Sequence, residues 1–320
     1  MSGESPSRSL VIGTDRGIYR APLDDIGYSR QVLARNRVFR VRRFGDALFA
    51  ATRSGLFRSR DSGRTWTPLG IPRSAVYSVV QSPTGERLYA GTHPAHLYVS
   101  TDNGGSWREL EGFRDVPSRE TWYTPRYRDK AHVRSLAVHP DSPDRVIAGV
   151  EVGGVLVSDD CGVSWTEHRA GLETERQDGL QYDVHHVLAL SGDAFVVSCG
   201  GGLYRTRDAG HSWTRLPDSD RPYFREAFSH GGRLYAAATR GPWESEMDAV
   251  LFESDDEGET LEAVPYPGVG DEFVLAWAAA DDADSAVFAG THTGSVLRRA
   301  DDAWTALGSV PARIRSLAVV

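Results

Sequence analysis

The stretch Ser59-Arg60-Asp61-Ser62-Gly63-Arg64-Thr65-Trp66 decides how this chain folds, because the chain repeats it. The pattern Ser/Thr-x-Asp-x-Gly-x-Ser/Thr-Trp returns at Ser100 to Trp107, Ser158 to Trp165 and Thr206 to Trp213, and a fifth copy at Ser254 to Leu261 carries leucine in place of tryptophan. The Asp can accept backbone hydrogen bonds at the head of a tight turn, and the Gly supplies a positive φ angle. The closing Ser/Thr and Trp begin a new strand. Five copies predict a repeat protein.

Two further phrases recur around these copies. One is an apolar strand ending in small residues, followed by Gly and a second apolar strand, as in Ala50-Ala51-Thr52 and Gly55-Leu56-Phe57. The other precedes it, as in Val76-Tyr77-Ser78-Val79, and its seventh copy, Ile314-Arg315-Ser316-Leu317, ends the chain with no strand after it. The strand at Val11 to Thr14 has none before it. We therefore predict an all-β fold, a seven-bladed β-propeller of four-stranded antiparallel blades, closed by the C-terminal strand joining three N-terminal strands.

Composition sets the class of protein. We expect residues 1–9 to form a disordered tail and residues 10–320 to form a single propeller domain. The 320 residues carry a formal net charge of −8, which argues against nucleic acid as a partner. No apolar run approaches the ~20 residues that span a bilayer, so we expect no membrane partner. The polar N-terminus lacks the apolar core of a signal peptide and there are 2 cysteines, so we expect a cytoplasmic protein.

Three insertions separate the repeats unevenly. The largest, Glu111 to Ala131, contains Trp122 and Tyr123; the others are Glu167 to Asp183 and Gly241 to Ala249, the last with Trp243. In a propeller, the connections from fourth strand to next blade and from second to third strand emerge on one face. All three insertions belong to these classes, so we expect them to mark the binding face.

Aligned repeats place equivalent residues at one height around the central channel. One set follows the second strand of each blade: Asp15, Arg53, His93, Glu151, Gly200, Arg240 and His292. The other lies near the start of the innermost strand: Phe39, Tyr77, Arg134, His185, Arg225, Leu275 and Arg315. Five arginines and three histidines predict a positive channel mouth that suits a carboxylate, phosphate or acidic sugar. The predicted ligand-binding residues are Arg53, Arg134, Arg225, Arg240, Arg315, Tyr77, Trp122, Tyr123 and Trp243.

Two kinds of chemistry could operate at this mouth. Glu151 and His185, a carboxylate and an imidazole, could act as general acid and base. Alternatively, His93, His185 and His292 with Glu151 could hold a divalent metal, because three histidines and a carboxylate suit zinc or iron. No other cofactor is predicted.

The repeated turns resemble those of the Asp-box, or bacterial neuraminidase repeat, β-propellers. The whole pattern is most similar to small single-propeller bacterial and archaeal sialidase-like proteins of unassigned function. The resemblance implies that the turn joins the third and fourth strands, opposite the functional face, and is structural. It assigns that role to Asp61, Asp102, Asp160, Asp208 and Asp256. Sialidases have six blades and an Arg-Ile-Pro segment that this chain lacks, which argues against sialidase activity.

Two functions from different classes follow. The first is a propeller whose Arg/His-rich mouth binds a small anionic or carbohydrate-like ligand, with hydrolase or lyase activity as a further step. The second is a non-catalytic protein-interaction scaffold that uses the long aromatic loops as anchors. Fold alone does not choose between them.

Overall fold

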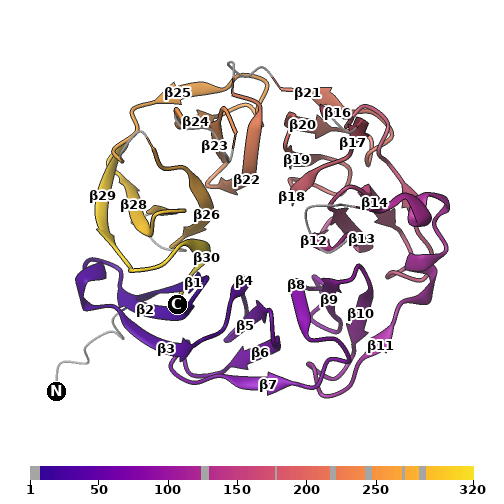
Figure 1. Ribbon diagram of the computed structural model, residues 1–320, viewed down its shortest axis with the longest axis horizontal. Coiled ribbons are helices and arrows are strands. Elements are labelled where there is room, and N and C mark those ends of the chain that lie inside the picture. The colour runs from indigo at the N-terminus through magenta and orange to yellow at the C-terminus, as the bar shows by residue number, and fades with distance from the viewer. Residues whose placement is uncertain are drawn as a thin grey trace.

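Seven four-stranded antiparallel sheets form a ring around a central channel (Figure 1). This architecture comes from a computed structural model that describes residues 8–123, 130–176, 179–216, 221–241, 247–268, 271–280 and 286–320. The innermost strands are β4 (Val38–Phe44), β8 (Ala75–Gln81), β12 (Val133–His139), β18 (Val184–Ala189), β22 (Tyr223–His230), β26 (Val274–Ala279) and β30 (Ile314–Val319). The seven-bladed, all-β prediction is confirmed.

The other strands follow outward in each blade. The second strands are β1 (Ser9–Thr14), β5 (Ala47–Thr52), β9 (Leu88–His93), β13 (Ser142–Val150), β19 (Phe195–Cys199), β23 (Arg233–Thr239) and β27 (Val287–Thr291). The third are β2 (Gly17–Pro22), β6 (Gly55–Ser59), β10 (Leu97–Ser100), β14 (Gly154–Ser158), β20 (Gly202–Thr206), β24 (Val250–Ser254) and β28 (Ser295–Ala300). The fourth are β3 (Arg30–Ala34), β7 (Thr67–Leu69), β11 (Arg108–Glu109), β15 (Thr166–Glu167), β21 (Thr214–Arg215), β25 (Glu262–Val264) and β29 (Ala303–Ser309).

One blade combines the two ends of the chain. Its strand order is β3-β2-β1-β30, and β30 pairs antiparallel with β1 from Leu10 opposite Val319 to Thr14 opposite Ile314. This is the predicted closure, and it leaves neither strand as an open sheet edge. The segment predicted to be a tail begins the first strand at Ser9, and residues 1–7 lie outside the described part of the chain.

Small residues at the end of the second strand let adjacent blades approach. A Cβ atom on Gly91 would lie 2.5 Å from a side-chain carbon of Val133 in the next blade, and one on Gly290 would lie 2.5 Å from Ile314. Both glycines face the innermost strand of a neighbouring sheet. The recurrent small residue in the second phrase is therefore a packing requirement of the ring.

The five repeated turns join third to fourth strands and share one hydrogen-bond pattern. In the first copy, Asp61 Oδ1 accepts from the Thr65 backbone N–H at 2.9 Å and Oδ2 accepts from the Thr65 hydroxyl at 2.6 Å, while Ser59 donates to Oδ1 at 2.8 Å. The same contacts recur at Asp102, Asp160, Asp208 and Asp256. Each aspartate is occupied in holding its own turn, as the resemblance implies.

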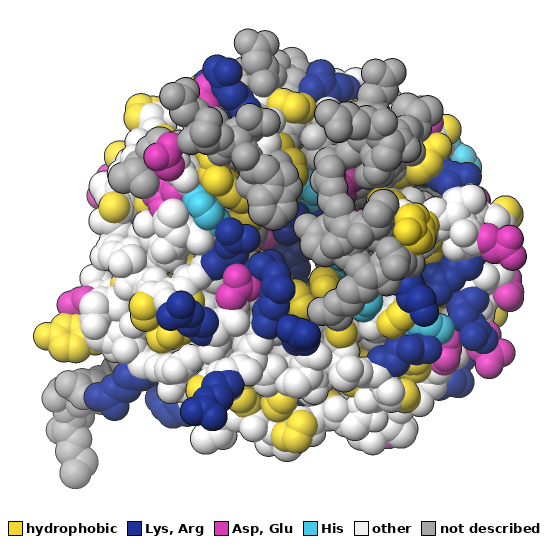
Figure 2. All heavy atoms as spheres, in the orientation of Figure 1, with side chains coloured by type: hydrophobic (Ala, Val, Ile, Leu, Met, Phe, Trp, Pro, Cys, Tyr) yellow, Lys and Arg dark blue, Asp and Glu magenta, His cyan; other side chains and the backbone are white. Residues whose placement is uncertain are grey.

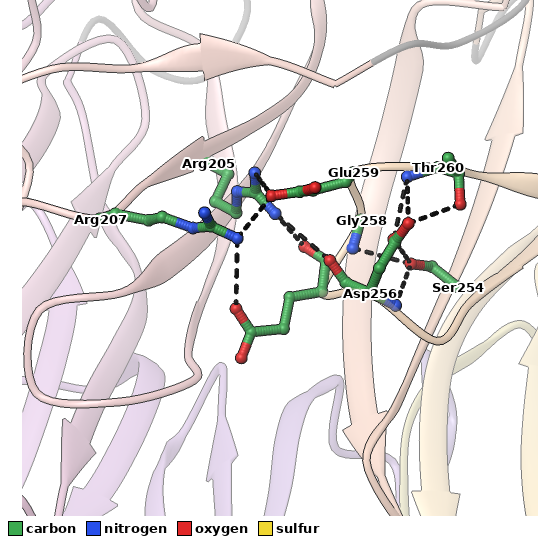
Figure 3. A network of polar contacts seen from close by, with 8 residues as sticks. Arg205, Arg207, Ser254, Asp256, Gly258, Glu259 and Thr260 are labelled. Carbon is green, nitrogen blue, oxygen red and sulfur yellow. Dashed lines mark hydrogen bonds and ion pairs between the residues drawn. The ribbon is translucent and has the colours of Figure 1, made fainter.

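Side chains of neighbouring blades also form hydrogen bonds and ion pairs with these turns. Arg205, on β20, donates to the Glu257 carbonyl at 3.0 Å and to Glu259 Oε1 at 3.3 Å, and Arg207 pairs with Glu259 at 2.7 Å (Figure 3). The turn glycine faces the preceding blade as well. At Gly162 φ is 91°, and a Cβ would lie 2.6 Å from Leu110 Cδ1. The glycine is therefore required by both the turn and the packing.

The insertions carry the remaining regular structure. The segment after β11 holds two 3₁₀ helices, η2 (Glu111–Arg114) and η3 (Pro117–Thr121), and a hairpin of β16 (Thr174–Arg176) and β17 (Gly179–Gln181) follows β15. A third 3₁₀ helix, η1 (Ile26–Tyr28), connects β2 and β3. Across the described ranges no helix has the length and apolar character needed to cross a membrane.

Candidate functional site

A cavity of about 220 Å³ occupies the channel at the face where the innermost strands begin. Lys and Arg side chains gather around the hollow at the centre of the ring (Figure 2). The cavity is lined by Arg37, Phe39, Arg40, Tyr77, His132, Arg134, Glu151, His185, Tyr223, Arg225, Glu226, Phe273, Leu275, Arg313 and Arg315. Six arginines and two glutamates give this lining a positive balance in an acidic protein.

All seven residues predicted near the start of the innermost strands line this cavity, from Phe39 and Tyr77 round to Arg315. Each of the seven strands has a β-bulge at this point, for example between Val76 and Ser78. A bulge leaves one residue out of the ladder and re-aims its side chain. Six of the innermost strands thus direct one non-ladder side chain into the mouth, and β22 directs two, Arg225 and Glu226.

A second tier of lining residues lies two positions earlier in the chain. It comprises Arg37, His132, Tyr223, Phe273 and Arg313. Residues two apart on an extended chain share a face, so the tier follows from the strand geometry. Sequence reasoning missed this tier, and its only signal was that spacing of two.

An ion pair that crosses the ring closes the floor of the cavity. Arg40 on β4 donates from Nη1 to Glu226 Oε2 on β22 at 2.5 Å, and Arg42 Nη2 lies 3.4 Å from Glu226 Oε1. His186 Nε2 lies 3.6 Å from the same oxygen. The blades of β4 and β22 are not neighbours in the ring (Figure 1), so these contacts span the channel.

Burial and charge oppose each other at this floor. Burial would raise the pKa of Glu226, but the surrounding basic groups, Arg40 foremost, outweigh it and lower that pKa to about 2. Burial lowers the pKa of His186 to about 3. The imidazole is therefore neutral near pH 7, and the two arginines are the charges that stabilise the Glu226 carboxylate.

A chain of charged groups runs along one side of the mouth. His132 Nδ1 lies 2.7 Å from Glu151 Oε2, and Arg134 Nη1 donates to Glu151 Oε1 at 3.0 Å. The same Nη1 lies 4.0 Å from Asp183 Oδ1, which lies 3.3 Å from His185 Nε2. Glu151 and Asp183 also form a backbone bridge between two blades. The proposed acid–base residues Glu151 and His185 are thus joined through Arg134 and Asp183.

This pairing bears on the catalytic prediction. Burial would raise the pKa of Glu151, but the charges of His132 and Arg134 lower it. A general acid needs a raised pKa, and a carboxylate held in its ionised form by two partners is a weak base. His185 Nδ1 faces the Phe224 carbonyl at 2.5 Å. Glu151 is held by partners of its own blade and His185 by the next blade, an arrangement that suits positioning of the mouth more than proton transfer.

The mouth arginines differ in their partners. Arg134 pairs with Glu151, Arg315 with Asp15, and Arg37 with Asp15 at 3.3 Å. In contrast, Arg225 donates to the neutral Tyr223 hydroxyl at 3.2 Å. Among the described residues, no carboxylate pairs with Arg225 or Arg313. Two guanidinium groups in the cavity wall are therefore available for an anion.

The structure places the second predicted set outside the cavity, except for Glu151. Arg53 is exposed, and Arg240 pairs with Asp248 at 3.2 Å with its side chain 59% exposed. His292 stacks on Phe273 at 4.7 Å between ring centroids, and its Nδ1 accepts from the Phe273 N–H. These residues follow the second strand, where Arg53 and Arg240 lie toward solvent and His292 packs against the lining residue Phe273.

The predicted metal ligands are not brought together. His93 packs near His132 at 6.1 Å between centroids, whereas His292 lies against Phe273. In the ranges that the structure describes, no three His, Cys, Asp or Glu side chains are grouped to hold a metal ion. The four proposed ligands come from separate blades, and each has a neighbour of its own.

The predicted aromatic anchors separate as well. Trp122 is buried, donates from Nε1 to the Ser118 hydroxyl at 2.8 Å and packs edge-on against Phe113. It belongs to the core and does not line the cavity, so the structure gives no support to its predicted ligand-binding role. Tyr123 is 55% exposed. Trp243 lies outside the described residues.

The chain matches no model of a known protein family. A xyloglucanase of Hypocrea jecorina (strain QM6a) is 39% identical over 71 residues, which is 20% of this chain and 8% of that protein.

Solved structures are similar over most of the chain. They include the GH74 xyloglucanase of Xanthomonas campestris, with TM-score 0.62, 18% identity and coverage of 84% of this chain and 45% of that one. A GH74 enzyme of Niastella koreensis gives TM-score 0.64, 17% identity and coverage of 85% and 45%. A structure of YCF48 bound to D1 peptide gives TM-score 0.60, 16% identity and coverage of 98% and 90%. This chain spans less than half of either GH74 enzyme, and the similarity at these identities is one of fold.

Proposed function

We propose that this propeller is a binding protein whose mouth cavity holds a small anionic ligand. The observation that carries the proposal is the contrast among the mouth arginines. Arg37, Arg134 and Arg315 each have a carboxylate partner, whereas Arg225 and Arg313 line the same cavity without one among the described residues. A guanidinium in a partly closed cavity binds carboxylate or phosphate through charge-assisted hydrogen bonds.

The cavity supports binding in two further ways. Its floor is closed by the Arg40–Glu226 ion pair, so a ligand enters from the mouth and stays there. Its two glutamates are held by neighbouring cations, so they add little repulsion to an incoming anion. The arrangement is fixed by strands of different blades, which keeps the donors in place before the ligand arrives.

Isothermal titration calorimetry with acetate, phosphate and sulfate, in an amine buffer that has no carboxylate, phosphate or sulfonate group, tests this proposal. Wild-type protein should bind at least one of these anions, and Arg225→Gln/Arg313→Gln should weaken that binding at least tenfold. The matched control is Arg108→Gln, which removes one exposed arginine from the outer strand β11. Equal binding by the double variant and the control would overturn the proposal.

A carbohydrate-active hydrolase is the second candidate. The similarity to GH74 enzymes and to a stretch of a xyloglucanase suggests it. If it is correct, the protein should release reducing ends from xyloglucan, and Glu151→Gln should abolish that release. The lowered pKa of Glu151 favours binding over this reaction.

A protein-interaction scaffold is the remaining alternative, supported by the similarity along nearly the whole chain to YCF48, a protein solved with a D1 peptide. Of the aromatic side chains predicted to anchor a partner, Trp122 is buried, so fewer of them remain for such a contact. A peptide carrying a free carboxylate could still use the mouth arginines, so this alternative shares the same cavity.

A further inference from the structure

One side of the mouth is a continuous aromatic wall. The rings of Phe39 and Tyr77 stack with centroids 3.9 Å apart and an interplanar angle of 13°. His132 continues the wall, with its centroid 4.0 Å from that of Tyr77. These residues come from three consecutive blades, those of β4, β8 and β12, and all three line the cavity.

A second aromatic run lies on the other arc of the ring. His185 and Tyr223 have centroids 4.9 Å apart, and Tyr223 lies 6.2 Å from Phe273 with planes at 85°. They belong to the blades of β18, β22 and β26 (Figure 1). The cavity is therefore bounded by aromatic rings on two opposite arcs.

The blade that closes the ring separates the two walls at one end. Its strand β30 lies between β26 and β4, and Arg313 and Arg315 face the cavity from its start. Arg315 is paired with Asp15, while Arg313 has no carboxylate partner among the described residues. The opposite end is the neutralised chain of Glu151, Arg134 and Asp183. A cation thus stands at one end of a space with aromatic sides.

Acidic sugars would find many donors but few available acceptors in this lining. A sugar presents hydroxyl groups on every edge, and burial leaves each one unsatisfied unless the protein offers acceptors or donors. The two lining carboxylates that could accept from hydroxyls, Glu151 and Glu226, are buried and held by cations. The remaining lining is dominated by aromatic rings, Leu275 and guanidinium groups.

From these observations we propose that the ligand is a planar ring acid, an aromatic or heteroaromatic carboxylate. Its ring lies against the wall of Phe39, Tyr77 and His132, and its carboxylate receives hydrogen bonds from Arg313 or Arg225. Offset and edge-to-face contacts favour a flat unsaturated ring over a puckered one of the same size. This inference rests on the proposed anion-binding function and narrows its ligand class.

The test compares acids of one charge and different shape. Dissociation constants of benzoate, cyclohexanecarboxylate, glucuronate and acetate are measured by ligand-observed NMR on the full-length protein. Benzoate should bind at least tenfold more tightly than each of the other three. Tyr77→Leu should weaken benzoate at least tenfold and leave acetate within twofold, while Tyr77→Phe, which keeps the ring, should retain benzoate affinity. Thermal unfolding of each variant confirms that it is folded.

The outcomes separate the two levels of the proposal. If cyclohexanecarboxylate or glucuronate binds as tightly as benzoate, the planar-ring inference is overturned while anion binding stands. If Tyr77→Leu lowers benzoate and acetate affinity equally, the wall has no role in selecting the ring, and the inference is again overturned. If none of the four acids binds, the planar-ring inference is wrong, and the proposed function is wrong as well when phosphate and sulfate also fail to bind. Should Tyr77→Leu not fold, Phe39→Leu in the same wall gives the same comparison.

Discussion

The two faces of this ring are built by opposite rules. On one face, five turns repeat the same residues and the same hydrogen bonds, from Asp61 to Asp256. On the other, seven equivalent bulge positions carry five different residue types, from Phe39 to Arg315. Repetition on one face marks what every blade needs in order to pack. Variation at matched positions on the other face falls where we propose that the ring binds its ligand.

The largest expected effect concerns the Arg40–Glu226 ion pair, which lies in the channel between the two faces. Glu226→Gln leaves the buried Arg40 without its carboxylate, and breaking a buried ion pair from one side costs about 4 kcal/mol. We expect chemical denaturation to show this loss in the free energy of unfolding, the largest effect predicted here. In Arg40→Leu/Glu226→Leu, which removes both charges, most of the stability should return. A double variant as unstable as the single one would show that the pair itself, and not the stranded charge, is what stabilises the channel.

The next largest loss of unfolding free energy is expected for a substitution in one of the repeated turns. Gly162→Ala adds a Cβ at a φ of 91° and 2.6 Å from Leu110 Cδ1. The left-handed conformation and the overpacking together should cost about 3 kcal/mol of unfolding free energy. The matched control is Gly45→Ala, at a φ of 56° with no atom within 4 Å, which should cost about 1 kcal/mol. Equal losses at the two glycines would mean that the turn conformation alone explains why glycine recurs in these turns. Contact between blades would then add nothing.

The sequence predicted much of this comparison in advance. The repeats indicated seven blades, the joining of β30 to β1 and the ring of seven lining residues, because each depends on local patterns that recur along the chain. The floor could not be predicted in this way. Arg40 and Glu226 are 186 residues apart, and no periodicity links two blades across a channel.

The structure differs from the expectation at the turns after the second strands, where Arg53 and Arg240 do not line the cavity. Arg53 and Arg240 were grouped with the mouth because they occupy equivalent positions in the repeat. Equivalence fixes the height of a residue in the ring but not the direction of a side chain on a turn, where no strand alternation applies. Trp122 lies in the core for a related reason, because an aromatic residue in an inserted segment can pack inward as easily as outward.

The protein should also lose stability in acid, because His186 is buried at the floor of the cavity. Burial lowers the pKa of His186 from 6.5 to about 3, so the unfolded chain binds this proton first. Between pH 6.5 and about 3 the unfolded state therefore holds more protons, and stability is lost as pH falls, with a limiting slope of about 1.4 kcal/mol per pH unit. Denaturation midpoints of wild type and His186→Gln, measured from pH 7.5 to 5, should diverge in slope over this window. Parallel curves would mean that His186 keeps an ordinary pKa in the folded ring.

The smallest expected effect is the change in benzoate affinity when an arginine outside the cavity is replaced. Arg53→Gln and Arg240→Gln should leave benzoate affinity within about twofold, because neither side chain lines the cavity and screening weakens a charge outside it. Arg225→Gln, which removes a lining guanidinium, should lower the same affinity about tenfold. NMR titrations of the three variants give the comparison. If Arg53 or Arg240 matters as much as Arg225, the ligand reaches over the turns of the second strands, and the binding surface is the wider ring of residues that the repeats alone had suggested.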